Sequence, residues 1–255
     1  MKVVAELVDG CHLKCALCWN RNRKPDFRNM PLDVVEMVID KYGSKGRGID
    51  WYNWGEPLLH KDFVTFSDMV KGTKSRVSSS LSFKLSDDKR EALVNFIKVV
   101  VSLSGMTEDI YRYYHHGGDF KTVIQNLESL TRKNVRVQWL EHPLNAHQLD
   151  ECKEYCRAIG VEFFRKGLNC EVENLRDGFK HKFIKTYYRV PRPKCYIKND
   201  IVIGADGEYL LCCASHNVKI GLNIRDDVSH EEIIAAKDKV KLCQECSERG
   251  LWKMF

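Results

Sequence analysis

Residues 2–18, KVVAELVDGCHLKCALC, join a short apolar run to a loop with three cysteines. Residues 2–8 predict a β-strand. The loop spaces Cys11, Cys15 and Cys18 as C-x3-C-x2-C. A structural zinc site takes four ligands, usually as two C-x2-C pairs, whereas three thiolates suit a 4Fe–4S cluster in which one iron lacks a protein ligand. We therefore interpret the loop as an iron–sulfur site with an open coordination position. Zinc and buried core cysteines are the alternatives.

The composition narrows the class of protein. The 255-residue chain carries 11 cysteines, 44% hydrophobic residues and a formal net charge of +6. Its apolar runs fall far short of the ~20 residues of a membrane-spanning helix. Glu6 interrupts the first run, which argues against a signal peptide. We therefore expect a cytoplasmic protein with no membrane or nucleic-acid partner. Because disulfides are rare in the cytoplasm, the cysteines indicate metal binding or catalysis.

The first two-thirds of the chain alternate strands and helices. The predicted strands are 2–8, 48–54, 75–83, 98–104, 135–140 and 161–165, and the predicted helices are 31–42, 61–71, 87–97, 107–131 with a break at Gly117-Gly118, and 147–159. Strands that alternate with helices imply right-handed crossovers and a parallel sheet. Eight such units close a barrel in about 250 residues. Here six units end near residue 165, so we expect an α/β fold with a partial, open (βα)6 barrel.

The pattern changes after residue 168. Residues 168–194 are charged and irregular, and two short strands follow at 199–204 and 208–212. Ala205-Asp206-Gly207 joins them, and Asp-Gly between β-branched runs predicts a hairpin. A helix is expected near 229–240. We therefore predict two units, a barrel over 1–168 and a linker with a small hairpin-plus-helix domain over 169–255.

The cysteine loop after the first strand of a partial barrel resembles the radical S-adenosylmethionine (SAM) superfamily. Two strand ends add to the resemblance. The segment at 54–57 resembles the superfamily's G-G-E-P segment, which holds the methionine amino group of SAM. The strand end at 101–105 resembles one whose hydroxyls bind the ribose or carboxylate of SAM, and helix capping is the alternative role for its serines. The resemblance implies SAM contacts from Trp54, Gly55, Glu56 and Pro57 in the first segment and from Ser102 and Ser104 in the second.

A second group of cysteines lies near the C-terminus. Cys195, Gly207 and Cys212 are spaced C-x11-G-x4-C, and Cys243-x2-Cys246 follows. The pattern resembles the SPASM/twitch extension of radical SAM enzymes, in its shorter twitch form. This resemblance implies an auxiliary 4Fe–4S cluster held by the four cysteines, for two clusters in total. Zinc is the alternative, since this spacing can also hold a tetrahedral ion.

The remaining cysteines have no firm role. Cys152 and Cys156 are four residues apart on one predicted helix, which favours a packed face. Cys170 and Cys213 lie near the second group and are candidates to return a hydrogen atom to a substrate radical. His115-His116, before Gly117-Gly118, is either a loop or a substrate contact.

The resemblance implies an oxidoreductase that uses an electron donor such as flavodoxin or ferredoxin to cleave SAM. The 5′-deoxyadenosyl radical then takes a hydrogen atom from the substrate. Electron transfer to the auxiliary cluster gives dehydrogenation, a returned hydrogen atom gives epimerisation, and radical capture gives a crosslink. The twitch form is similar to an enzyme that oxidises an aminocyclitol, which favours a small sugar-like substrate. We expect no further domain before the first strand, which favours a small substrate or a peptide delivered by another protein. The alternatives are a ribosomal peptide substrate and a non-enzymatic zinc-binding module.

Overall fold

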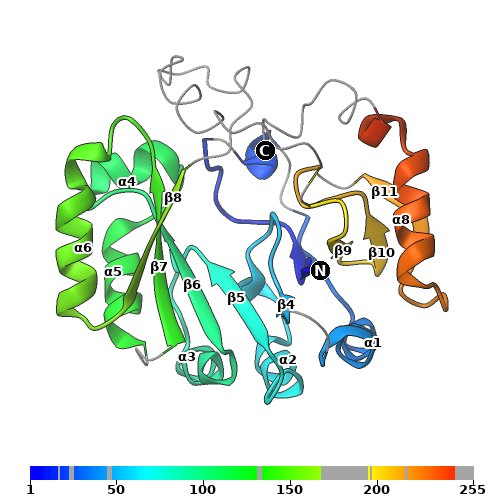
Figure 1. Ribbon diagram of the computed structural model, residues 1–255. Helices are drawn as coiled ribbons and strands as arrows, with labels where there is room; N and C mark the ends of the chain where they lie inside the picture. The colour runs from blue at the N-terminus through cyan, green and yellow to red at the C-terminus, as the bar shows by residue number, and fades with distance from the viewer. Residues whose placement is uncertain are drawn as a thin grey trace.

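The computed structural model describes residues 1–16, 18–22, 26–44, 48–130, 134–167, 195, 197–215 and 218–244. Six strands follow one another in the sheet, each parallel to the next: β1 (Val3–Ala5), β4 (Ile49–Asp50), β5 (Ser75–Ser79), β6 (Lys98–Leu103), β7 (Val135–Glu141) and β8 (Glu162–Gly167). In Figure 1 they form an open arc with helices along its outer side. The predicted α/β fold with an open parallel sheet is confirmed.

The helices between these strands begin and end close to their predicted positions. They are α1 (Leu32–Tyr42), α2 (Phe63–Met69), α3 (Asp87–Ala92), α4 (Glu108–Tyr114), α5 (Phe120–Ser129) and α6 (Leu149–Ala158). Short 3-10 turns are η1 (Trp19–Asn22), η2 (Pro57–Leu59), η3 (Leu93–Asn95) and η5 (Ala146–Gln148). Ser86 caps α3 by accepting from the N–H of Lys89, and Gly160 leaves α6 at a φ of 72°. A side-chain cap thus sets the start of α3, and a left-handed glycine follows the end of α6.

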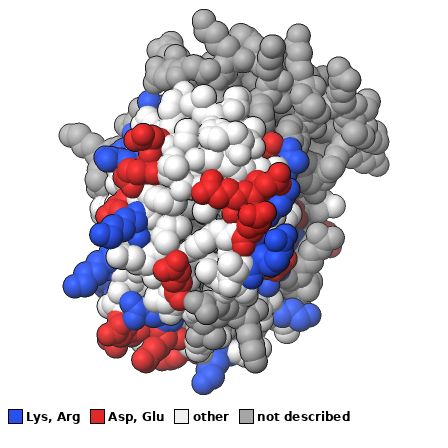
Figure 2. Space-filling model, turned by 90° about the vertical axis from the view of Figure 1, so that its left-hand side faces the viewer, with Lys and Arg blue, Asp and Glu red and all other residues white. Residues whose placement is uncertain are grey.

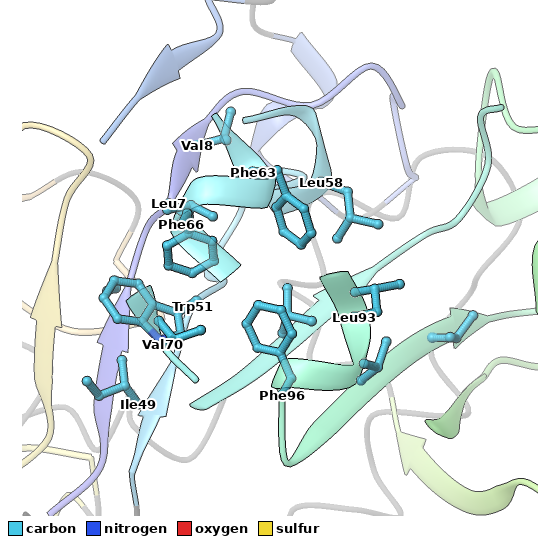
Figure 3. Close-up of a cluster of buried hydrophobic side chains, with 14 of the residues drawn as sticks. Leu7, Val8, Ile49, Trp51, Leu58, Phe63, Phe66, Val70, Leu93 and Phe96 are labelled. Carbon is cyan, nitrogen blue, oxygen red and sulfur yellow. The ribbon is translucent and has the colours of Figure 1, made fainter. Parts of the chain in front are cut away.

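The hydrophobic core lies between the sheet and the helices. Alternate residues of β6, such as Val99 and Val101, are fully buried there. An aromatic group fills the space under α2, where the rings of Phe66 and Trp51 lie 5.0 Å apart and those of Phe66 and Phe96 lie 5.9 Å apart. Figure 3 shows these side chains gathered with Phe63 and Leu58. This packing holds the helical layer against the strands.

The opposite face of the sheet, which we call the inner face, carries charged side chains. Lys2 contacts Asp50 at 2.7 Å, and Arg136 and Lys98 contact Glu162 at 2.5 and 2.8 Å. Parallel sheets with both faces covered by helices are apolar on both sides. These charges therefore show that the inner face is not a second hydrophobic core of that kind.

The C-terminal strands extend the same sheet. β9 (Ile201–Ile203) pairs in parallel with β1, and β10 (Glu208–Leu210) and β11 (Lys219–Asn223) follow antiparallel. Gly207, at a φ of 82°, forms the predicted hairpin turn. The helix α8 (His230–Lys239) begins with a capping box between Ser229 and Glu232. Neither β11 nor the pairing of β9 with β1 was expected. The linker 168–194 lies outside the described residues, and the division into units 1–168 and 169–255 stays a prediction.

A small antiparallel ribbon stands beside the main sheet. It pairs β2 (Val8–Asp9) with β3 (Arg28–Asn29), and Arg28 also forms an ion pair with the buried carboxylate of Asp9. On the face seen in Figure 2, basic and acidic side chains are interspersed, in line with the even spread of charge along the sequence. Among the described residues, no helix is both long and apolar enough to cross a membrane.

We expect Phe66→Ala to lower the free energy of unfolding by about 3–5 kcal/mol, because it leaves a void among packed rings. Phe164→Ala is the matched control, since Phe164 is 45% exposed and its ring contacts Arg136. That control should cost no more than about 1 kcal/mol. Urea unfolding of both variants measures the difference, and equal losses would contradict the assigned core.

Candidate functional site

The three predicted cluster ligands lie in one loop directly after β2. Cys11, Cys15 and Cys18 are all half-buried. The N–H of Cys18 donates to the carbonyl of Cys15 over 3.1 Å, and the N–H of Arg21 donates to the carbonyl of Cys18 over 3.0 Å. The loop therefore turns back on itself and leads into η1.

The end of α4 holds this loop in place through main-chain bonds. The N–H of Lys14 donates to the carbonyl of His116 over 3.0 Å, and the N–H of Ala16 donates to the carbonyl of Tyr114 over 2.8 Å. The His115-His116 turn is thus a backbone support for the cysteine loop. Its position next to the loop was not expected from the sequence.

Buried side chains on the protein side support the His115-His116 turn. Ser104 Oγ and His115 Nδ1 are hydrogen bonded at 2.7 Å, and the ring of Tyr111 stacks on His115 with 4.6 Å between ring centres. Burial lowers the pKa of His115 to about 3, so its ring is neutral near pH 7. Ser104 is fully buried, and Thr107 holds the N-cap position of α4. Ser102 is half-buried, and SAM binding by either serine stays a prediction.

The cysteine thiols lie close enough to influence one another. Burial raises the pKa of Cys11 to about 12, and the nearby carboxylate of Glu56 adds to this. Burial also raises the pKa of Cys15, with further contributions from Cys18 and Cys11. Thiolates so placed repel each other unless a cationic group lies among them. The donor set therefore fits a metal cluster bound by all three.

Within the described ranges, no group of three or more His, Cys, Asp or Glu side chains is placed to hold a metal ion. A 4Fe–4S cluster spreads its cysteines over several irons, so its ligands need not converge on one point.

The Gly55-Glu56 turn, which follows β4, lies against the start of the cysteine loop. A Cβ on Gly55 would lie 1.8 Å from the carbonyl oxygen of Val8, so no side chain fits there. The N–H of Glu56 donates to the carbonyl of Gly10 over 2.9 Å. The carboxylate of Glu56 is buried and accepts from the N–H and Oγ of Ser80 at 2.8 and 2.9 Å. Binding of SAM by this turn stays a prediction.

Sequence reasoning missed the role of Glu6. Its carboxylate accepts from the N–H of Trp54 at 2.9 Å and from the N–H of Gly55 at 2.6 Å. Glu6 is 1% exposed, and burial raises its pKa to about 7. The sequence signal that could have revealed this role was the presence of an acidic residue within the first apolar run. Glu6 therefore braces the Trp54–Pro57 turn from inside the protein.

Three of the four cysteines predicted for the second cluster lie near one another. The charges of Cys195 and Cys212 both raise the pKa of Cys243, although burial is the largest cause. The N–H of Cys212 donates to Ser215 Oγ over 3.2 Å. Cys246 and Cys170 lie outside the described residues. The three described cysteines come from separate segments of the chain.

Cys213 lies apart from the second group in its surroundings. It packs on Val4, Val202 and Leu210, on the inner face of the sheet. Burial raises its pKa, which favours the thiol over the thiolate. Cys152 and Cys156 are fully buried in the core on α6, so their predicted packing role is confirmed.

Comparison with known proteins identifies the family. The radical SAM superfamily model matches residues 6–159, which is more than half of the chain. The chain belongs to the radical SAM superfamily. The sporulation killing factor maturation protein SkfB of Bacillus subtilis is 24% identical over 182 residues, covering 69% of this chain and 44% of SkfB. The GTP 3',8-cyclase of Clostridium perfringens is 25% identical over 139 residues, covering 52% and 43%. The match thus spans less than half the length of each relative.

Solved structures share the fold at low sequence identity. Streptococcus suis SuiB bound to the precursor peptide SuiA has a TM-score of 0.69 at 15% identity, covering 96% of this chain and 66% of SuiB. Native anSMEcpe with bound AdoMet has a TM-score of 0.64 at 15% identity, covering 99% and 88%. BtrN in complex with AdoMet and 2-DOIA has a TM-score of 0.56 at 16% identity, covering 99% and 90%. The predicted resemblance to SPASM/twitch-type enzymes is confirmed at the level of the fold.

The raised pKa of buried Glu6 predicts that the free energy of unfolding depends on pH. Because the pKa of Glu6 is about 7 in the folded protein against 4.5 ordinarily, the folded state holds a proton that the unfolded state has lost between these pH values. The contribution of Glu6 to the free energy of unfolding therefore falls as the pH rises between these two pKa values, by about 3 kcal/mol in all. Glu6→Gln cannot titrate and should remove that slope.

Urea unfolding at a series of pH values under anaerobic conditions measures the effect. Glu36→Gln, which removes an exposed carboxylate on α1, is the control for loss of a charge. A Glu6→Gln variant with the same pH slope as the wild type would contradict the assigned burial.

Proposed function

We propose that this radical SAM enzyme binds a 4Fe–4S cluster through Cys11, Cys15 and Cys18 and removes a hydrogen atom from a peptide substrate. The observation that carries the proposal is a loop of three mutually close thiols, held by α4 on one side and by the Gly55-Glu56 turn on the other. When bound, the cluster and SAM supply a 5′-deoxyadenosyl radical, which is the reagent for hydrogen abstraction.

The protein's own residues position the reactants. Trp54, Gly55, Glu56 and Pro57 form the predicted contact for the methionine end of SAM, and Ser102 and Ser104 for the ribose or carboxylate. The main-chain bond from Glu56 to Gly10 and the side-chain bond from Asn20 to the carbonyl of Trp54 join this turn to the cysteine loop, so the two would hold the cluster and SAM at a fixed separation.

Several relatives support a peptide substrate. SuiB was solved with a precursor peptide, anSMEcpe was solved with the Cp18Cys and Kp18Cys peptides, and SkfB is a maturation protein for a killing factor. The small sugar-like substrate expected from the sequence remains a second candidate. BtrN, solved with 2-DOIA, favours it, since the match covers 90% of that chain.

We assign the second group, Cys195, Cys212, Cys243 and Cys246, to an auxiliary 4Fe–4S cluster in the 169–255 unit. The influence of Cys195 and Cys212 on the pKa of Cys243, beside the burial that raises it most, supports this. The auxiliary cluster would take an electron in dehydrogenation, and flavodoxin or ferredoxin would supply the electron for SAM cleavage. Cys213, kept as a thiol by burial, is the described candidate for returning a hydrogen atom, and Cys170 is the other.

Iron analysis tests both clusters. Anaerobically prepared wild type should hold about eight irons per chain, and a Cys11→Ala, Cys15→Ala, Cys18→Ala triple variant about four. The triple variant should form no 5′-deoxyadenosine from SAM under dithionite, because the open iron is lost. Cys152→Ala, which changes a buried cysteine on α6, is the control and should keep both clusters and the activity.

Two results would overturn the proposal. Cleavage of SAM by the triple variant would remove the first cysteine loop from the reaction. Zinc in place of iron at both sites would favour the non-enzymatic binding module.

The products of the reaction distinguish a peptide substrate from a sugar-like one, and they distinguish epimerisation from dehydrogenation or crosslinking. A short peptide encoded beside the gene should be modified when incubated with enzyme, SAM and reductant, and mass spectrometry would detect the change. Loss of two hydrogen atoms indicates dehydrogenation or a crosslink. An unchanged mass in water, with one deuterium gained in deuterated water, indicates epimerisation.

If the reaction is an epimerisation, Cys213→Ser should abolish the deuterium label while 5′-deoxyadenosine still forms. An unmodified peptide beside an oxidised sugar would support the second candidate.

A further inference from the structure

The inner face of the sheet carries more basic than acidic side chains. Side chains alternate between the two faces of a strand. Val99, Val137 and Phe163 pack on the core side, so their neighbours along each strand point to the inner face. Along the six parallel strands, with Lys2 just before β1, the inner face holds five basic side chains and two carboxylates. The described part of this face is therefore positively charged.

Four of the basic side chains share the two carboxylates between them. The ion pairs join Asp50 to Lys2 and Arg76, and Glu162 to Lys98 and Arg136. Because a carboxylate carries one negative charge, each group of three keeps one positive charge in excess. The side chains of Lys2 and Arg136 are 39% and 32% exposed, so a bound anion can reach a cation of each group.

Lys166, on β8, adds a third excess positive charge. It lies on the same face as Phe164, two residues before it, and is in register with Leu140 of β7. Its side chain is exposed, and no described acidic side chain forms an ion pair with it. Burial nevertheless lowers the pKa of Lys166, and the charge of Lys2 adds to this. The ammonium is therefore poorly solvated, and a bound anion would stabilise it.

An exposed aromatic ring lies beside these cations. Phe164 is 45% exposed, and the guanidinium of Arg136 lies 5.6 Å from the centre of its ring. Phe164 is in register with Gln138, and Gln138 with Ser102, a predicted SAM contact. Neighbouring strands are about 4.8 Å apart, so the Cα atoms of Phe164 and Ser102 are about 10 Å apart. An apolar group held on this ring would thus lie near the proposed source of the radical.

The charge of this face distinguishes between the two candidate substrates. An acidic peptide segment would neutralise the excess positive charge, and its apolar side chains could pack on the exposed ring of Phe164. The amines of an amino sugar are cationic, and the same face would repel them. The inner face therefore favours an acidic peptide over an amino sugar.

We propose that the inner face binds the substrate peptide at an acidic residue next to an apolar one, with the carboxylate at Lys166 and the apolar side chain on Phe164. The proposal rests on the proposed function, which makes a peptide the substrate. Lys166 and Phe164 are then specificity-determining residues of that substrate site. They bind the peptide without forming or breaking any covalent bond.

The binding of synthetic peptides to anaerobically prepared holoprotein with SAM, in the absence of reductant, tests this proposal. The probes are hexapeptides Gly-Phe-Glu-Glu-Phe-Gly, Gly-Phe-Gln-Gln-Phe-Gly and Gly-Phe-Lys-Lys-Phe-Gly with one neutral fluorescent label. Fluorescence anisotropy measures each dissociation constant at low and at moderate salt. We expect the Glu peptide to bind about tenfold more tightly than the Gln peptide, and salt to reduce this advantage. Equal binding of the Glu and Gln peptides, or binding of no peptide, would overturn the proposal.

Variants on the inner face locate the binding site. Lys166→Gln should weaken binding of the Glu peptide about fivefold. Lys166→Glu should weaken it further and should bind the Lys peptide more tightly than the wild type does. Phe164→Ala should weaken binding of all three peptides alike, because it removes apolar surface and no charge. Lys121→Gln, which replaces an exposed lysine on α5, is the matched control and should bind like the wild type.

Tighter binding of the Lys peptide by Lys166→Glu cannot arise from a misfolded variant, since loss of the fold would weaken binding of every peptide. If Lys166→Glu shows the same preference for the Glu peptide as the wild type, the proposal is wrong.

Failure of the proposed function gives a different result. A wild-type protein that holds no iron, or that forms no 5′-deoxyadenosine from SAM, would remove the radical reaction regardless of the peptide affinities. A wild-type protein that cleaves SAM but binds the Glu and Gln peptides equally would remove this proposal alone.

Discussion

The parallel pairing of β1 with β4 on one edge and β9 on the other sets the position of both cysteine sites. The first cysteine loop leaves the end of β1 through β2, and the second group of cysteines is carried by segments around β9. Val3, Val4 and Ala5 are all buried, as expected for a central strand of a parallel sheet. The start of the chain is thereby joined to a strand far along it, with Val3 in register with Ile201.

Buried carboxylates then fix the local geometry beside β1. Glu6 binds the main-chain N–H groups of Trp54 and Gly55, and Glu56 binds Ser80. These bonds are made in a poorly solvated environment, where an unmade hydrogen bond is expensive. The turn is therefore rigid, and its backbone reaches the cysteine loop because Gly55 has no side chain. A cluster that must hold one open coordination position needs such a fixed surrounding.

Most elements could be predicted from the sequence because their signals are local. The apolar run of β6, the Ser86 cap of α3 and the Asp206-Gly207 turn each depend on a few neighbouring residues. β11 was missed because its sequence, Lys219–Asn223, contains Gly221 and exposed positions and so lacks a clear alternation. The pairing of β9 with β1 was missed because strand partners far apart in the chain are chosen by the whole sheet. No local pattern of either strand specifies its neighbour.

The sequence by itself indicated the class of protein, because the C-x3-C-x2-C loop after the first strand resembles that of the radical SAM superfamily. It also determined that Cys152 and Cys156 would pack, because residues four apart share one helix face. Only the tertiary structure decided that Glu6 supports the Trp54–Pro57 turn and that the His115-His116 turn supports the first cysteine loop. Both act on residues distant in the chain through main-chain bonds, which carry no sequence signal. These side chains matter because they are buried, and burial is a property of the folded chain that the sequence does not show directly.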